Sequence, residues 1–174
     1  IELNLSCPNV EDGSLFGHNA ELTARAVAAV KANTDLPVLA KLAPNVPSIT
    51  DIAKAAVDAG ADALTICNTI PAMRIDTATR QPVLGNTTGG LSGVGLRPVS
   101  LALVYQVSKM VDVPIIGVGG IFSGEHAAEY ILAGASAVQI GSANLVGLTA
   151  PWRILAELED WMRQSGISSL KELA

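Results

Sequence analysis

The sequence predicts an α/β protein that forms part of a (β/α)8 TIM barrel, and three observations lead to this fold class. Hydrophobic residues make up 49% of the 174 residues and charged residues 16%, whereas aromatic residues make up only 3%. The apolar residues are mainly Ala, Val, Leu and Ile, which is typical of buried parallel strands covered by helices. Short apolar runs alternate with segments of helical periodicity, and part of this pattern repeats. We therefore expect a single domain over residues 1–174.

The expected strands and helices alternate along the chain. Five short apolar runs are expected to be strands, namely residues 1–5, 37–42, 63–66, 114–118 and 137–140. Apolar residues recur at helical spacing in residues 19–32, 49–59, 98–111, 124–132 and 151–164. Asn19 and Ser123 stand at N-cap positions, and Gly60 and Gly134 stand where helices end. These local signals support the same alternation of strand and helix.

A repeat favours a barrel over a doubly wound sheet. Residues 58–64 resemble residues 132–138, and residues 35–38 resemble residues 112–115, with a similar shift of about two βα units. The five expected strands are fewer than the eight of a closed barrel. The chain also opens directly on a run typical of a buried strand. We therefore expect an N-terminally truncated barrel of about five βα units, with three strands missing on the N-terminal side.

Composition argues against several classes of protein. A net charge of -5 and a pI of about 4.9 argue against a nucleic-acid-binding protein, which needs a basic face. No apolar run approaches the ~18 residues of a membrane span. The only cysteines, Cys7 and Cys67, do not make a disulfide scaffold, so a reducing cytoplasm is expected. His18 and His126 lack the spacing of metal ligands, so no metal site is expected.

Cys7 directly follows the first expected strand and lies between two carboxamides, Asn4 and Asn9. A thiol with an ordinary pKa of about 8.5 can serve as a proton-abstracting base. The carboxamides offer paired donors and acceptors to a planar ligand rich in amide groups. The alternative interpretation is a buried structural cysteine beside the turn at Pro8.

Polar side chains also end the next two expected strands. Lys41 is either the partner of an acidic residue or a cation directed at an anionic group, because an unpaired lysine is almost never fully buried. Asn68 and Thr69 either bind a ligand or simply begin a turn. Cys67 is better explained by packing than by chemistry.

Glycine-rich turns follow the last two expected strands. Gly119 and Gly120 come after one, and Gly141 and Ser142 come after the other, where they open a short helix. Glycines allow a ligand to approach the backbone closely, and a (β/α)8 barrel commonly binds phosphate at these loops. Tight turns without a ligand are the alternative. The connection over residues 69–97 lacks periodicity and is long enough to indicate a functional loop.

Six ordered motifs together resemble those of the dihydroorotate dehydrogenase family. They are residues 4–10 (NLSCPNV), 41–45 (KLAPN), 68–69 with 73–76 (NT and MRID), 89–93 (GGLSG), 117–121 (GVGGI) and 141–142 (GS). The resemblance covers essentially the whole chain. It points to the cytosolic class 1 catalytic subunit and, within class 1, to the NAD-linked (1B) branch.

The resemblance implies an FMN-dependent enzyme that oxidises (S)-dihydroorotate to orotate in pyrimidine biosynthesis. Cys7 would remove the C5 proton while hydride leaves C6 for the flavin. Lys41 would favour the negative charge of reduced FMN. The cofactor-binding positions would be Asn4, Lys41, Cys67, Gly93, Gly119, Gly120, Gly141 and Ser142. The substrate-binding positions would be Asn4, Asn9, Asn68 and Thr69.

The resemblance also implies partners. The NAD-linked branch works with an electron-transfer subunit that carries FAD and a [2Fe–2S] cluster, and a homo-oligomer is expected. Val94-Gly95 and Ser142 depart from the more common Pro-Ala and Thr of the family. Three alternatives remain open, namely a fumarate-linked class 1A enzyme, a reductase similar to dihydropyrimidine dehydrogenase, and a non-catalytic phosphate-binding barrel fragment.

Overall fold

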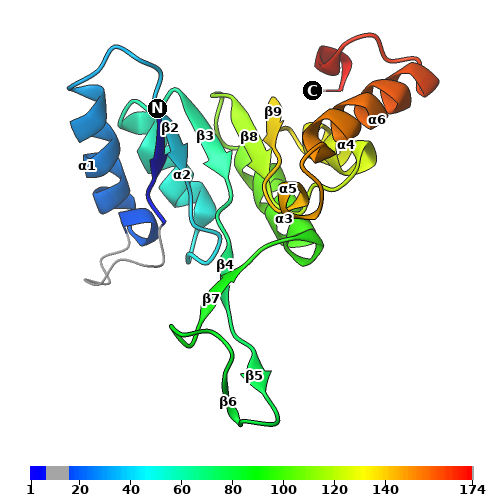
Figure 1. Ribbon diagram of the computed structural model, residues 1–174. Coiled ribbons are helices and arrows are strands. Elements are labelled where there is room, and N and C mark those ends of the chain that lie inside the picture. Colours follow the sequence, from blue (N-terminus) through cyan, green and yellow to red (C-terminus); the bar gives the residue numbers. More distant parts are fainter. Residues whose placement is uncertain (7–15, 174) are drawn as a thin grey trace.

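A five-stranded parallel sheet forms the centre of the computed structural model, which describes residues 1–6 and 16–173 (Figure 1). The strands are β1 (Glu2–Asn4), β2 (Leu39–Lys41), β3 (Ala63–Ile66), β8 (Ile115–Val118) and β9 (Ala137–Gln139). They lie side by side in the order β1-β2-β3-β8-β9, and each pair is parallel. All five strands expected from the sequence are therefore confirmed.

The expected helices are also present. They are α1 (Ala20–Lys31), α2 (Ile49–Asp58), α3 (Arg97–Ser108), α4 (Gly124–Leu132) and α6 (Ala150–Gln164), and the short helix α5 (Ala143–Val146) follows β9. Helix α3 ends at Ser108 rather than at residue 111, because the chain turns there before entering β8. Within residues 1–6 and 16–173, no helix is long and apolar enough to cross a membrane.

The helix ends follow the signals in the sequence. The Asn19 side chain accepts a hydrogen bond from the Leu22 backbone N–H at 3.0 Å, and the Ser123 hydroxyl accepts one from the His126 N–H at 3.3 Å. Gly134 follows α4 with a φ of 104°, and its Cβ, if present, would stand 2.4 Å from Ser108 Cβ. Only glycine fits this combination of left-handed backbone and close approach.

The two faces of the sheet differ in character, because side chains alternate along each strand. Leu64 and Ile66 of β3 are fully buried and belong to the hydrophobic core shared with the helices. Thr65, between them, points to the opposite face. Lys41 is its register partner on β2 and therefore lies on the same face as Thr65.

This second face is concave. Gln139 Nε2 donates a hydrogen bond to Glu2 Oε2 at 2.7 Å, although Glu2 lies on β1 and Gln139 on β9, the two edge strands. Side chains of the edge strands can meet only if the sheet curves toward the face that carries them. The described residues thus form a curved parallel sheet, and its closure into a (β/α)8 barrel stays a prediction.

The segment between β3 and α3 contains short strands that the sequence did not indicate. Strand β4 (Ile70–Ala72) pairs antiparallel with β7 (Gly89–Leu91), and β5 (Ile75–Asp76) pairs with β6 (Gln81–Pro82). Figure 1 shows this excursion extending away from the central sheet. These strands are two or three residues long, which is too short for an alternating pattern to be recognised.

Candidate functional site

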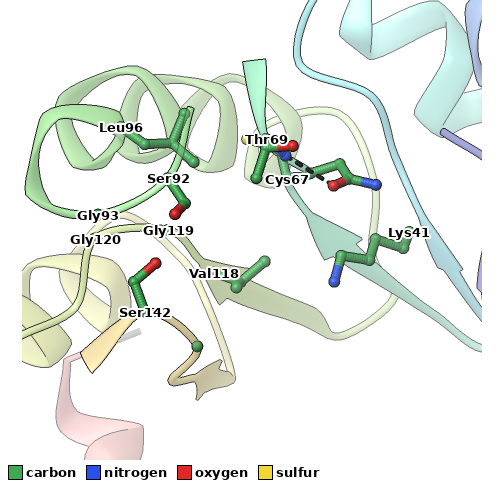
Figure 2. A pocket seen from close by; sticks show the side chains of 12 residues that line it. Lys41, Cys67, Thr69, Ser92, Gly93, Leu96, Val118, Gly119, Gly120 and Ser142 are labelled. Carbon is green, nitrogen blue, oxygen red and sulfur yellow. Dashed lines mark hydrogen bonds between the residues drawn. The ribbon is translucent and has the colours of Figure 1, made fainter. Parts of the chain in front are cut away.

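A pocket of about 170 Å³ lies at the carboxyl ends of the central strands (Figure 2). Its lining residues are Lys41, Cys67, Asn68, Thr69, Ser92, Gly93, Leu96, Val118, Gly119, Gly120, Gly141 and Ser142. They come from the ends of β2, β3, β8 and β9 and from the segment between β7 and α3. The fold therefore brings together residues that are far apart in the sequence.

Most of the site residues expected from the sequence line this pocket. Asn4 is not among the lining residues, but its side chain accepts a hydrogen bond from Asn68, which does line the pocket. Cys7 and Asn9 lie outside the described residues. The sequence analysis did not select Ser92, Leu96 or Val118 as site residues, although Ser92 belongs to the GGLSG motif and Val118 to the GVGGI motif.

Lys41 is the partner of an acidic residue, and its direction toward an anionic group stays a prediction. Its Nζ lies 3.6 Å from Glu2 Oε1, and the same side chain lines the pocket. Burial raises the pKa of Glu2, but hydrogen bonds from Thr65 and Gln139 and the charge of Lys41 outweigh burial, so the pKa lies below its ordinary value. The pocket wall therefore contains an ammonium group beside an ionised carboxylate.

Asn68 is held in place by residues at the end of β1. Its Nδ2 donates hydrogen bonds to Asn4 Oδ1 at 3.0 Å and to Ser6 Oγ at 2.7 Å. Its Oδ1 accepts a hydrogen bond from the Thr69 backbone N–H at 2.8 Å. These bonds orient the amide beyond what turn formation alone requires. Asn68 is thus a preorganised polar group at the pocket wall.

Cys67 is buried, with 2% of its surface exposed. Burial raises the pKa of its thiol to about 11, and a hydrogen bond with Ser100 and the charge of Lys41 offset only part of that rise. The thiol is therefore neutral near pH 7, whereas the thiolate is the reactive form. This state agrees with a packing role for Cys67.

The turn after β8 brings two backbone segments into close contact. Gly119 and Gly120 have φ values of 132° and 66°, in the left-handed region that favours glycine. A Cβ on Gly120 would stand 2.6 Å from the carbonyl oxygen of Gly93 and 3.0 Å from the backbone nitrogen of Arg97. The pocket wall therefore needs glycine at position 120.

Buried side chains stabilise the turn after β8 through hydrogen bonds to its backbone. Tyr130, which is fully buried, donates a hydrogen bond from its Oη to the Gly119 carbonyl oxygen at 2.7 Å. Ser100 Oγ donates one to the Val118 carbonyl oxygen at 2.6 Å. Gly141, by contrast, has no other group within 4 Å of the place where a Cβ would stand. Gly141 thus leaves open space beside a firmly held turn.

The fold and the pocket define the protein as an α/β protein of the parallel-strand class, with a pocket at the carboxyl ends of its strands, where such proteins commonly bind ligands. Residues 1–162 match the family model described as "Dihydroorotate dehydrogenase". The chain belongs to the dihydroorotate dehydrogenase family, as its motifs indicated.

Curated relatives carry the same name. The chain is 48% identical to "Dihydroorotate dehydrogenase B (NAD(+)), catalytic subunit" of Geotalea daltonii and of Geobacter metallireducens, and 50% identical to that of Desulforudis audaxviator. Each alignment covers 99% of this chain and 57% of the relative. The chain thus spans a little over half the length of the curated relatives it matches.

Proposed function

We propose that the full-length protein is the FMN-dependent catalytic chain of an NAD-linked dihydroorotate dehydrogenase, which oxidises (S)-dihydroorotate to orotate in pyrimidine biosynthesis. The observation that carries the proposal is the pocket in which Lys41, Asn68 and two glycine turns converge. The names of the relatives support the same activity. In this proposal the curved sheet is part of a closed (β/α)8 barrel, and the chain is the C-terminal part of that single domain.

The residues of the pocket fit FMN. Open space at Gly141 and the glycines of the turn after β8 leave a wall without side chains, as a phosphate or a flat ring requires. Gly93, Gly119, Gly120, Gly141 and Ser142 would hold the cofactor. Cys67 would supply a neutral, apolar contact, and Asn4 would contact both cofactor and substrate. Bound FMN would supply the hydride acceptor for C6 of dihydroorotate.

Lys41 would provide electrostatic stabilisation in the pocket. Its ammonium lies among neutral side chains and backbone on the pocket side. A fixed cation favours whichever state of the site carries more negative charge. Lys41 would therefore bind FMN more tightly after reduction than before it.

Carboxamide side chains would hold the substrate, and Cys7 would remove the proton from its C5 atom. Asn68 and Thr69 line the pocket, and the amide of Asn68 is oriented by Asn4 and Ser6. Asn9 completes the proposed substrate-binding set. Cys7 directly follows Ser6 in the chain. As the base, Cys7 would accept the proton and carry it away from the substrate.

The proposal includes partners. The relatives are named "catalytic subunit", which supports a second subunit. As the resemblance to the NAD-linked branch implies, this subunit would transfer electrons and carry FAD and a [2Fe–2S] cluster. The proposal further includes a homo-oligomer located in the cytoplasm, as the resemblance to the cytosolic class 1 enzymes implies.

The test uses the purified full-length protein, mixed anaerobically with dihydroorotate. We expect yellow protein whose flavin absorbance is lost as orotate forms. Colourless protein that cannot be loaded with FMN would contradict the proposal and favour a non-catalytic phosphate-binding barrel. Direct reduction of fumarate without a second subunit would instead indicate the class 1A enzyme. Reduction of a pyrimidine base, with no oxidation of dihydroorotate, would indicate the dihydropyrimidine dehydrogenase-like alternative.

A further inference from the structure

A polar cluster on the concave face of the sheet lies next to the pocket, and Lys41 is its one member with a part in the function proposed above. Its members are Glu2 of β1, Lys41 of β2, Thr65 of β3 and Gln139 of β9. Lys41 is the member that lines the pocket. Thr65 and Gln139 each contact the carboxylate of Glu2.

Hydrogen bonds to one oxygen of the Glu2 carboxylate fix its orientation, and the other oxygen faces Lys41. Oε2 accepts hydrogen bonds from Thr65 Oγ1 and from Gln139 Nε2, both at 2.7 Å. Oε1 faces Lys41 Nζ at 3.6 Å. Two neutral donors on different strands thus hold the carboxylate, and its orientation does not depend on Lys41.

Glu2 is the charge partner of Lys41. Within residues 1–6 and 16–173, no other acidic side chain comes within 4.0 Å of the Lys41 ammonium. The side chains of both residues are mostly shielded from solvent, with 23% of Lys41 and 29% of Glu2 exposed. Partial burial strengthens the interaction, because less water screens the two charges.

We propose that Glu2 is a positioning residue that holds the Lys41 ammonium at the pocket wall and offsets part of its charge there. This inference rests on the proposed function, in which Lys41 faces bound FMN. A paired ammonium attracts an anion less than a free one does, so Glu2 would limit how strongly Lys41 favours reduced FMN over oxidised FMN. The Glu2 carboxylate would thereby lower the reduction potential of the bound FMN.

The experiment measures the midpoint potential of FMN bound to the full-length protein. In the Glu2→Gln variant, Thr65 and Gln139 retain an oxygen to donate to, but the negative charge is gone. We expect the preference for reduced over oxidised FMN to rise by about three- to tenfold, and a tenfold change corresponds to about 30 mV for a two-electron couple. Glu2→Asp keeps the charge and should change the preference less.

A double-mutant cycle tests whether Glu2 acts through Lys41. The rise caused by Glu2→Gln should disappear when Lys41 is already replaced by Met. Asp62→Asn is the matched control, because Asp62 pairs with Lys31 at 2.9 Å, and neither residue lines the pocket. This control should leave the midpoint potential unchanged.

The outcomes separate the inference from the function on which it rests. Wild-type protein that binds no FMN would overturn the proposed function and this inference with it. FMN-loaded protein whose potential does not rise in Glu2→Gln would overturn the inference alone. An equal rise in the Lys41→Met background would overturn it as well, because Glu2 would then act on the flavin directly. Equal shifts in Glu2→Gln and Glu2→Asp would show that the charge is not the cause.

Discussion

Replacing Gly120 with alanine should destabilise the protein, because two independent constraints act at this position. The φ of 66° lies in the left-handed region, which an alanine adopts only at a cost of about 1–2 kcal/mol. The new Cβ would also stand 2.6 Å from the Gly93 carbonyl oxygen, 2.8 Å from Arg97 Cβ and 3.0 Å from Arg97 N. Two of these three atoms are backbone atoms, which cannot move aside as a flexible side chain can.

The expected magnitude follows from adding the two costs. Overpacking of a tight contact costs about 1–3 kcal/mol. Together with the backbone strain, the loss comes to about 2–5 kcal/mol, a large fraction of the 5–15 kcal/mol that stabilises most proteins. Since 1 kcal/mol shifts the unfolding temperature of a domain of 150–250 residues by about 2–4 °C, and that of a longer protein by less, we expect a decrease of several degrees and of no more than about 20 °C.

The assay is thermal unfolding of the full-length protein without FMN, followed by circular dichroism. Gly141→Ala is the matched control, because Gly141 also lines the pocket but has no other group within 4 Å of its Cβ position. This variant should unfold within about 0.5 kcal/mol of wild type. In the proposed function it should nevertheless bind FMN more weakly, because its methyl group occupies space in the pocket.

The reasoning would be refuted by a Gly120→Ala variant that unfolds at the wild-type temperature. It would also be refuted if Gly141→Ala lost as much stability as Gly120→Ala. In that case the contact between the turn after β8 and the Gly93 segment would not be as close as the structure has it.

Four further predictions concern Cys7, Lys41 and Cys67. Cys7→Ser should slow flavin reduction by dihydroorotate at neutral pH by about 100- to 10,000-fold, because a hydroxyl is a far weaker base than a thiol, and an unchanged stopped-flow rate would remove Cys7 from this role. Lys41→Ala should weaken FMN binding by roughly tenfold or more, as a titration with FMN would measure, whereas wild-type affinity and reduction rate would contradict the role of Lys41. In FMN-free Cys7→Ser protein, Cys67 should react slowly with iodoacetamide near neutral pH, as mass spectrometry would detect, because burial raises its pKa to about 11. The unfolded thiol loses its proton near pH 9.0, so the stability gained from burying neutral Cys67 should be full below that pH and be lost as the pH rises to about 11. Fast labelling of the folded protein, or stability that rises over this range, would contradict the burial of Cys67.

The sequence predicts the regular part of the fold because its signals are local. Asn19 and Ser123 cap helices through side chains that reach only three residues ahead, and Gly60 and Gly134 adopt left-handed backbone directly after helices. Parallel strands that are covered on both faces appear in the sequence as short apolar runs. Their number and their order along the chain can therefore be predicted from the sequence.

The sequence cannot predict features that depend on contacts between distant segments. The hydrogen bond between Glu2 and Gln139 depends on the curvature of the whole sheet. Leu96 reaches the pocket from a segment without periodicity, and nothing in its sequence neighbourhood distinguishes it from a core residue. Gly120, by contrast, could be predicted as a site residue, because consecutive glycines after a strand indicate a special backbone, although the contact with Gly93 could not.

A crystal structure of the full-length protein with FMN and orotate would test the central claim most directly. The account predicts electron density for the flavin in the pocket beside Lys41, with its phosphate at the turns of Gly120 and Gly141. It also predicts that the sulfur of Cys7 faces the bound orotate. Flavin density at another place, or a Cys7 sulfur directed toward the surrounding helices, would contradict the account.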